Sequence, residues 1–215
     1  PQLNERICLA AEFLKSKDIS AGMCVAIMTG INLDTIVFLF ALFRLGAIAF
    51  PISEKIPHQT KEVYVEWTKC QLIIDEVLLQ NDWLKYCSDY SDKTPFSYAA
   101  LSLDQPSTYI LTSGSSGFQK VAVHNLGNHF ISAFSSQKNI PLTTQSRYLL
   151  NLPLNHVSGL AILFRTFLNG ATLVINDHLS LDAVVSNYQI THISCVEAQL
   201  KSLFSLYDSK QQDML

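Results

Sequence analysis

Short apolar runs and amphipathic segments alternate along the chain. Residues 24–28 and 47–50 have the pattern of buried strands, and the strongly apolar residues 33–45 between them predict a helix. Asn32 is expected to cap this helix at its N-terminus, and Gly46 is expected to end it. Because a strand–helix–strand unit buries its strands on both faces, the pattern predicts a parallel sheet with a right-handed crossover.

The same alternation continues along the rest of the chain, with no internal repeat. A helix capped by Asn125 is expected to have an apolar face, formed by Leu126, Phe130, Ala133 and Phe134. The other predicted helices and strands lie at 3–14, 57–68, 71–74, 147–151, 160–168, 171–175, 181–188, 192–194 and 196–206. This order predicts an α/β fold with mainly parallel sheets and helices on both faces.

Residues 81–105 interrupt the alternation. Their composition shifts to Ser, Asp, Tyr and Lys, and Pro95 and Pro106 are expected to break any regular element. With 215 residues, the chain can bury a core and is long enough for one large or two small lobes. The expected division is therefore a first α/β lobe at 1–105 and a second α/β lobe at 106–215.

Composition narrows the class of protein. The chain is 48% hydrophobic and 15% charged, which is typical of a globular protein. Its net charge of -3 and the lack of a Lys/Arg run argue against a nucleic-acid partner, and its six histidines do not cluster at metal-ligand spacings. The five cysteines form no CxxC pair, which favours reduced thiols and a cytoplasmic location. The apolar run 36–43 is shorter than the roughly 20 residues of a membrane span.

Residues 112–120, Thr-Ser-Gly-Ser-Ser-Gly-Phe-Gln-Lys, have the composition of a phosphate-binding loop. They lie between a predicted strand and another short apolar run. Two glycines allow backbone N–H groups to converge, while the hydroxyls and one ammonium supply further donors. The alternative interpretation is a flexible Ser/Gly connection on the surface.

The spacing of this loop excludes two common nucleotide motifs. A Walker loop has a lysine directly after its second glycine, whereas Phe118 follows Gly117 here. The dinucleotide fingerprint requires a third glycine at the start of a helix, and none is present. The sequence therefore supports neither a P-loop GTPase nor a Rossmann dehydrogenase.

Two segments together resemble the adenylate-forming enzymes, the superfamily of acyl- and aryl-CoA synthetases, peptide-synthetase adenylation domains and luciferase. The loop 112–120 follows that family's phosphate loop, except that Gln119 stands where proline is usual. Residues 152–159, Leu-Pro-Leu-Asn-His-Val-Ser-Gly, resemble its acyl-pocket motif, with Asn155 in place of an aromatic residue. Within the superfamily, the region from about 107 to 204 is most similar to the o-succinylbenzoate–CoA ligases of menaquinone biosynthesis.

This resemblance implies a set of binding residues. The ATP phosphates would be bound by Thr112, Ser113, Gly114, Ser115, Ser116, Gly117 and Lys120. The acyl substrate would be bound by His156, Ser158, Gly159 and Arg165. A lone histidine in an apolar neighbourhood is more often a structural residue, and the motif is what favours a pocket role for His156. Arg165 interrupts an apolar helix seven residues after Ser158, so its guanidinium needs an anion, a nearby acid or helix carbonyls.

The resemblance also implies the reaction and its partners. ATP and a small carboxylic acid would give an acyl-adenylate and pyrophosphate with the help of Mg²⁺, and the CoA thiol would then displace AMP. Neither a nucleic-acid partner nor a membrane span is expected, no residue is assigned to a metal, and homo-oligomerisation is left open. The family completes its site with an aromatic-Gly-x-Thr-Glu motif, an aspartate and a lysine-bearing C-terminal domain. All eight glycines here follow Ala, Thr, Leu, Ser or Asn. The sequence therefore predicts an N-terminal fragment that lacks a complete catalytic set and is inactive alone.

Two alternatives remain beside an o-succinylbenzoate ligase. One is a ligase for another acyl or aryl acid, such as a fatty acid. The other is a non-catalytic module that binds nucleotide through the loop. Arg165 bears on the first alternative, because a second substrate carboxylate would pair with its guanidinium.

Overall fold

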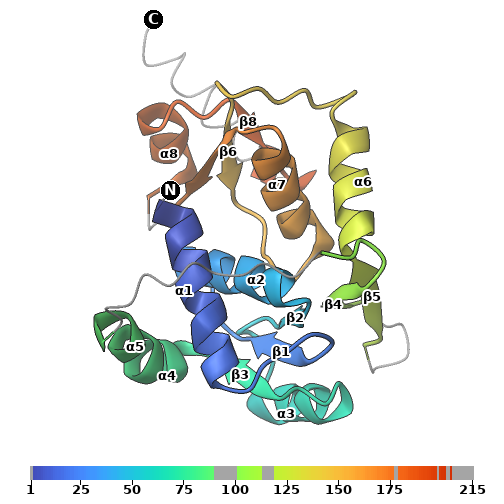
Figure 1. Ribbon diagram of the computed structural model, residues 1–215. Helices are drawn as coiled ribbons and strands as arrows, with labels where there is room; N and C mark the ends of the chain where they lie inside the picture. Colours follow the sequence, from blue (N-terminus) through green and yellow to red (C-terminus); the bar gives the residue numbers. More distant parts are fainter. Residues whose placement is uncertain are drawn as a thin grey trace, which may run out of the picture. The chain divides into compact units, whose positions relative to one another are not determined.

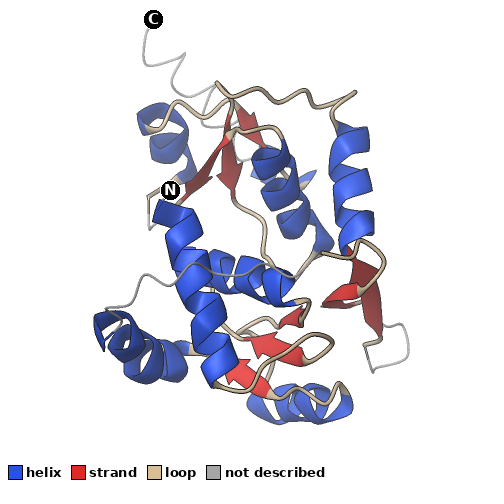
Figure 2. Ribbon diagram, viewed as in Figure 1, coloured by secondary structure: helices blue, strands red, loops and turns tan. Residues whose placement is uncertain are grey.

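A computed structural model of the chain describes residues 2–89, 101–112, 119–176, 179–197, 199–201 and 204. The chain folds as two compact units. Unit 1 comprises residues 1–130 and 153–157, and unit 2 comprises residues 131–152 and 158–215. Helices and strands alternate in both units (Figure 2), and the α/β class expected from the sequence is confirmed.

Unit 1 is built on a five-stranded sheet with the strand order β3-β1-β2-β4-β5. The first three strands pair in parallel, β2 also pairs in parallel with β4, and only β5 runs antiparallel, against β4. The strands are β1 (Cys24–Ile27), β2 (Ile48–Pro51), β3 (Leu72–Ile74), β4 (Pro106–Leu111) and β5 (Val121–Asn125). The predicted parallel strand–helix–strand unit is thus present at the centre of this sheet.

Alternate side chains along β1 and β2 are buried on opposite faces of the sheet. Cys24, Ala26, Ile48 and Phe50 form one buried cluster with Tyr64 of α3 (His58–Trp67). The intervening residues of both strands are also buried. They face the side of α2 (Leu33–Leu45), which contacts α1 (Gln2–Ser16), and Figure 1 shows α2 and α3 on opposite sides of the strands. Both faces of the central strands are therefore covered, as the apolar runs predict.

The caps of α2 are those expected from the sequence. Asn32 accepts a hydrogen bond from the Thr35 backbone N–H at 2.8 Å. Gly46 adopts a φ of 69°, a left-handed conformation that only glycine adopts without strain. A side chain that accepts a backbone hydrogen bond therefore begins this helix, and a glycine in the left-handed conformation ends it.

A helical segment that the sequence does not predict follows β3. It consists of α4 (Glu76–Leu78), a π-helical turn (Leu79–Trp83) and α5 (Leu84–Asp89). Asp75 begins the segment by accepting a hydrogen bond from the Leu78 N–H at 2.9 Å. Trp83 anchors this helical segment to the core. The centroid of its ring lies 5.1 Å from that of Phe38 and 5.5 Å from that of Phe13. Polar composition at 81–89 therefore marks the outer face of a helix and not a linker.

Unit 2 contains a three-stranded parallel sheet with the order β7-β6-β8. Its described elements are β6 (Arg147–Leu150), α7 (Val157–Leu168), β7 (Thr172–Ile175), α8 (Leu181–Asn187) and β8 (His192–Ile193), and α6 (Leu126–Ser136) leads into it from unit 1. Leu149, Val174 and Val184 form the core between the sheet and α8. The predicted elements from residue 147 to 194 are all present, with ends that differ by a few residues.

The two units do not divide at residue 105. Strands β4 and β5, at 106–125, belong to the sheet of unit 1, and the units separate at Phe130/Ile131. The proline at position 106 opens β4 instead of following a domain boundary. Among the described residues, no helix is long and apolar enough to cross a membrane.

Candidate functional site

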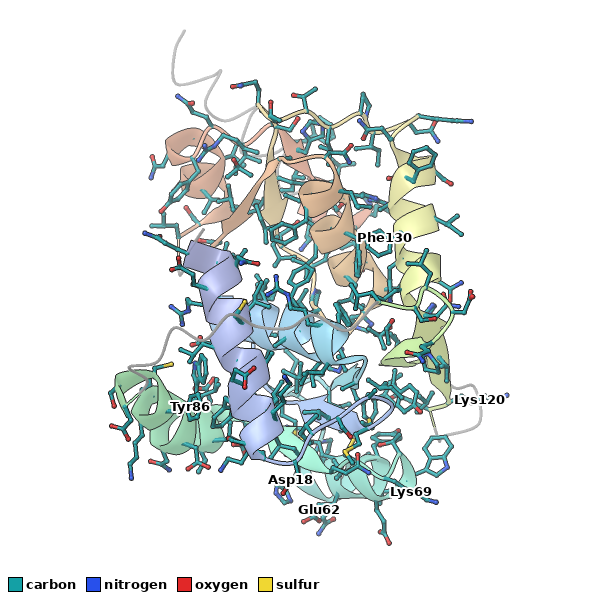
Figure 3. All side chains as sticks on the ribbon, viewed as in Figure 1. Asp18, Glu62, Lys69, Tyr86, Lys120 and Phe130 are labelled. Atoms are coloured by element: carbon teal, nitrogen blue, oxygen red, sulfur yellow. The ribbon has the colours of Figure 1, made fainter. Side chains whose placement is uncertain are left out.

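The ends of the Ser/Gly loop are held by strand pairing. In unit 1, β4 and β5 pair antiparallel up to Leu111 opposite Val121. One step further, the Thr112 N–H donates to the Lys120 carbonyl at 2.9 Å, and the Thr112 hydroxyl donates to the same oxygen at 3.2 Å. The predicted phosphate-binding residues 113–117 lie outside the described residues. Lys120 itself is exposed, and its side chain points away from the sheet (Figure 3).

A buried histidine supports the strand that leads into the loop. His129 in α6 is 5% exposed, and its Nε2 lies 2.8 Å from the hydroxyl of Thr108 in β4. Burial, and to a lesser degree the charge of neighbouring His124, lowers the pKa of His129 to about 4. A neutral imidazole therefore joins α6 to β4 at neutral pH.

The sequence does not predict this role for His129, and the expected apolar face of α6 is partly wrong. Leu126 and Ala133 are buried as expected, but Phe134 is 78% exposed and His129 occupies the buried face instead. His129 lies three residues after Leu126 and four before Ala133, a spacing that places all three on one helical face. That spacing is the signal by which the sequence could have identified it.

His156 lies at a cavity of about 270 Å³ within unit 1. The cavity is at the carboxyl ends of β1 and β2, where parallel sheets commonly bind ligands. The residues that line it include Thr29, Gly30, Ser53, Glu54, Pro153 and His156. His156 itself is exposed, and the residues that line the cavity beside it include Ile31, Ile52 and Leu154 as well as the polar residues.

The polar residues of this cavity were not predicted. Thr29 follows β1, and Ser53 and Glu54 follow β2, so all three lie where two neighbouring parallel strands end. That position is the available signal, because consecutive parallel strands end at the same edge of a sheet. The described residues that line the cavity do not include Thr112 or Lys120.

The other predicted acyl-binding residues belong to α7 in unit 2. Ser158 is exposed and Gly159 is buried in the first turn of the helix, and Arg165 follows two turns later. Ser158 and Arg165 lie on one helical face, separated by roughly 10 Å along the axis. The residues assigned to the acyl substrate are thus divided between two units, with His156 in unit 1 and the other three in unit 2.

Arg165 has a buried donor without a partner. Its Nε is inaccessible to solvent and makes no hydrogen bond with any described residue. In the same unit, Asn151 at the end of β6 donates from Nδ2 to the Ser194 carbonyl at 2.7 Å, but its buried Oδ1 also has no described partner. Buried polar atoms are rarely left unpaired, so these two atoms are candidates for ligand contacts. The sequence did not predict Asn151 as a site residue.

The described residues offer no metal centre. No group of three His, Cys, Asp or Glu side chains among them is arranged to hold an ion.

Comparison with known proteins identifies relatives along nearly the whole chain. The model of the family described as AMP-binding enzyme matches residues 1–214. The 2-succinylbenzoate–CoA ligase of Bacillus velezensis is 29% identical over 212 residues, which are 92% of this chain and 43% of the relative. That of Haemophilus influenzae is 30% identical over 203 residues, covering 94% of this chain and 42% of the relative. The chain thus spans less than half the length of these relatives.

Solved structures of the same enzyme from Bacillus subtilis have the same fold. The o-succinylbenzoate CoA synthetase in complex with the acyl-adenylate intermediate OSB-AMP matches with a TM-score of 0.83 and 26% identity, over 94% of this chain and 57% of that chain. The complex with ATP and magnesium ion matches with a TM-score of 0.80 and 26% identity, over 94% of this chain and 58% of that chain.

Proposed function

Because this chain belongs to the AMP-binding enzyme family, we propose that it forms the N-terminal part of an ATP-dependent acid–CoA ligase whose substrate is o-succinylbenzoate. The enzyme would adenylate the acid and transfer the acyl group to CoA, a step of menaquinone biosynthesis. The observation that carries this proposal is the match along 92% of the chain to a relative named for this acid. A structural relative holds OSB-AMP, which is the intermediate that this reaction requires.

The nucleotide phosphates would bind at the Ser/Gly loop. Hydrogen bonds between Thr112 and Lys120 close the ends of this loop, and the hydroxyls and N–H groups of residues 113–117 would be the phosphate donors. The Lys120 ammonium would offset charge on the departing pyrophosphate by an electrostatic contact. Lys120 acts here by positioning and not as a nucleophile.

Arg165 would select the acid. o-Succinylbenzoate carries a second carboxylate besides the one that is activated, and a carboxylate is the preferred partner of a guanidinium. The buried, unpaired Nε of Arg165 supports this role, because a carboxylate oxygen would supply the acceptor that no described residue provides. Ser158, on the same face of α7, would add a hydroxyl donor.

His156 would contribute to the wall of the acyl site. It is exposed at a cavity that contains hydroxyl groups and the Glu54 side chain, so substrate can reach its ring. Its proposed contact is with the carboxylate that is activated. Gly159 is buried in the first turn of α7, and the N–H groups of this turn would face an anionic group of the substrate.

ATP, CoA and the acid are the proposed small-molecule partners, and a structural relative is bound to ATP with magnesium ion. Since the described residues hold no metal cluster, we assign no side chain of this part of the chain to Mg²⁺, which commonly binds through substrate phosphates. A cytoplasmic location forms part of the proposal, because all five cysteines are thiols.

The test is a substrate comparison with the protein made from the complete reading frame that encodes this chain. Formation of CoA thioesters would be measured for o-succinylbenzoate, for benzoate and for a fatty acid, in the presence of ATP and Mg²⁺. We expect o-succinylbenzoate to be used with a kcat/KM at least about 100-fold above the others, since loss of a buried charge pair costs about 2–5 kcal/mol. Preferred use of a fatty acid would contradict the assignment.

Arg165→Leu distinguishes a loss of substrate recognition by the arginine from a general loss of activity through misfolding. We expect it to lower kcat/KM for o-succinylbenzoate by about 100-fold and to leave benzoate, which lacks the second carboxylate, nearly unaffected. Arg165→Lys is the matched control that keeps the charge without the planar fork, and it should retain part of the activity. Unchanged use of o-succinylbenzoate by Arg165→Leu would exclude the pair between the arginine and the substrate carboxylate.

A further inference from the structure

Two cysteines that the proposed reaction does not use lie side by side in unit 1. Cys24 is the first residue of β1, and Cys70 precedes β3 by two residues. Their Sγ atoms are 3.1 Å apart. The Gln71 N–H donates to the Cys24 carbonyl at 2.9 Å, and Gln71 Oε1 accepts from the Cys24 N–H at 2.9 Å. Strand pairing therefore holds the two thiols together, although 46 positions separate them in sequence.

The two thiols differ in accessibility. Cys24 is 4% exposed, within the core cluster beneath α3. Cys70 is half-buried and lines a cavity of about 710 Å³. Lys69 and Glu62, labelled in Figure 3, line the same cavity, as does Lys61. A small molecule that enters this cavity reaches Cys70 first, and Cys24 only through Cys70.

Hydrogen bonds give the two thiols different chemical roles. The bond with Cys24 lowers the pKa of Cys70, and the Thr68 hydroxyl and Ala26 backbone lower it further, against the opposing effect of burial. The Thr68 hydroxyl lies 3.2 Å from the sulfur of Cys70. The same bond to Cys70, burial and the charge on Cys70 all raise the pKa of Cys24. Cys70 is therefore the nucleophile of the pair, and Cys24 retains its proton.

We propose that Cys24 and Cys70 form a thiol-modification site, in which Cys70 captures a small disulfide such as oxidised glutathione and Cys24 resolves the adduct into an internal disulfide. The Cys70 thiolate forms a bond to one sulfur of the small disulfide, whose other sulfur leaves as a thiolate. Cys24 then attacks the sulfur of Cys70, and its proton passes to the second departing thiolate. Two protein thiols are oxidised, and one small disulfide is reduced to two thiols.

The geometry requires little movement for this step. The sulfurs would approach from 3.1 Å to the roughly 2 Å of a disulfide bond, a shift of about one ångström that side-chain rotation can supply. The other three cysteines, Cys8, Cys87 and Cys195, are also thiols, and they serve as internal references for reactivity.

The test uses the protein made from the complete reading frame that encodes this chain, first reduced and then exposed to oxidised glutathione. Remaining thiols would be alkylated, and peptides would be mapped by mass spectrometry. We expect a Cys24–Cys70 cross-link that dithiothreitol reverses, formed at a rate roughly tenfold or more above glutathione addition at any other cysteine. Cys24→Ser should accumulate a mixed disulfide at Cys70, because no resolving thiol remains.

Cys70→Ser should abolish both the cross-link and any adduct at Cys24, which small molecules do not reach directly. Cys195→Ser is the matched control, and it should form the Cys24–Cys70 cross-link at the unaltered rate. A Cys70 adduct that persists in the unsubstituted chain, or glutathione addition distributed evenly over all five cysteines, would overturn the proposal. The peptide map of the unsubstituted chain decides this even where a serine variant does not fold.

Discussion

The sheets of the two units bury their strands to different extents, although the strand sequences are similarly apolar. In unit 1, every residue of β1 and β2 is buried. In unit 2, β7 buries only Val174, and neither residue of β8 is buried. The difference follows position in the sheet, because β1 and β2 are central whereas β7 and β8 are the outer strands beside β6. Central position, more than local hydrophobicity, therefore determines how strongly a strand contributes to stability.

The largest expected effect tests this difference with one matched substitution in each unit. Ile27 ends β1 and is 1% exposed, whereas Ile175 ends β7 and is half-buried. Ile27→Ala should lower the free energy of unfolding by about 2–5 kcal/mol. Ile175→Ala should lower it by about half as much, because removing a half-buried side chain leaves little or no internal cavity. Urea unfolding followed by circular dichroism measures both values. Equal losses of unfolding free energy in the two variants would show that the position of a strand in its sheet does not control the effect of the substitution.

The second prediction concerns the buried imidazole at the edge of the same core. The pKa of His129 falls from 6.5 to about 4 on folding, so in that range the unfolded chain binds a proton that the folded chain excludes. Stability should fall as pH decreases through 6.5 and level off below 4, by at most about 3 kcal/mol. His129→Gln should remove this part of the pH dependence in urea unfolding between pH 7 and pH 4. Parallel curves for the variant and the unsubstituted chain would exclude His129 as the cause.

The smallest expected effect compares helix caps. Asn32 caps α2 in unit 1 through a side-chain bond to Thr35, whereas Ser180 begins α8 in unit 2 without such a bond. Asn32→Ala should cost about 1 kcal/mol of unfolding free energy, and Ser180→Ala no more than about 0.5 kcal/mol. Thermal unfolding of the two variants measures the difference. A larger loss of unfolding free energy for Ser180→Ala would mean that the hydrogen bond of the capping side chain does not determine how strongly a cap stabilises its helix.

Much of the fold was predictable, because local signals produce it. Asn32 and Gly46 define α2 through interactions within a few residues, and apolar runs mark the buried strands. The helical segment after β3 was missed, because its stability comes from contacts of Trp83 with Phe13 and Phe38, far away in sequence. The predicted boundary at residue 105 was wrong for a related reason. Polar composition indicates a connecting segment, but it does not specify which sheet the next strand joins.

Only the parts of the candidate site that a motif or an unusual residue type marks were proposed from the sequence. The loop and Arg165 stay proposals, and the buried Nε of Arg165 supports the proposed role of that residue. The cavity at His156 depends on Thr29, Ser53 and Glu54, which come together only when β1 and β2 pair. Likewise, the closeness of Cys24 and Cys70 results from the pairing of β1 with β3. Such proximity between distant residues is a product of topology, which no local pattern contains.

The bonds between Thr112 and Lys120 have a further consequence for how the intervening loop can change. Bringing two strands together costs conformational entropy, and here the pairing of β4 with β5 meets that cost before any ligand arrives. Substitutions and small changes of length between residues 113 and 118 would therefore alter what the loop binds while leaving the hairpin that holds it intact.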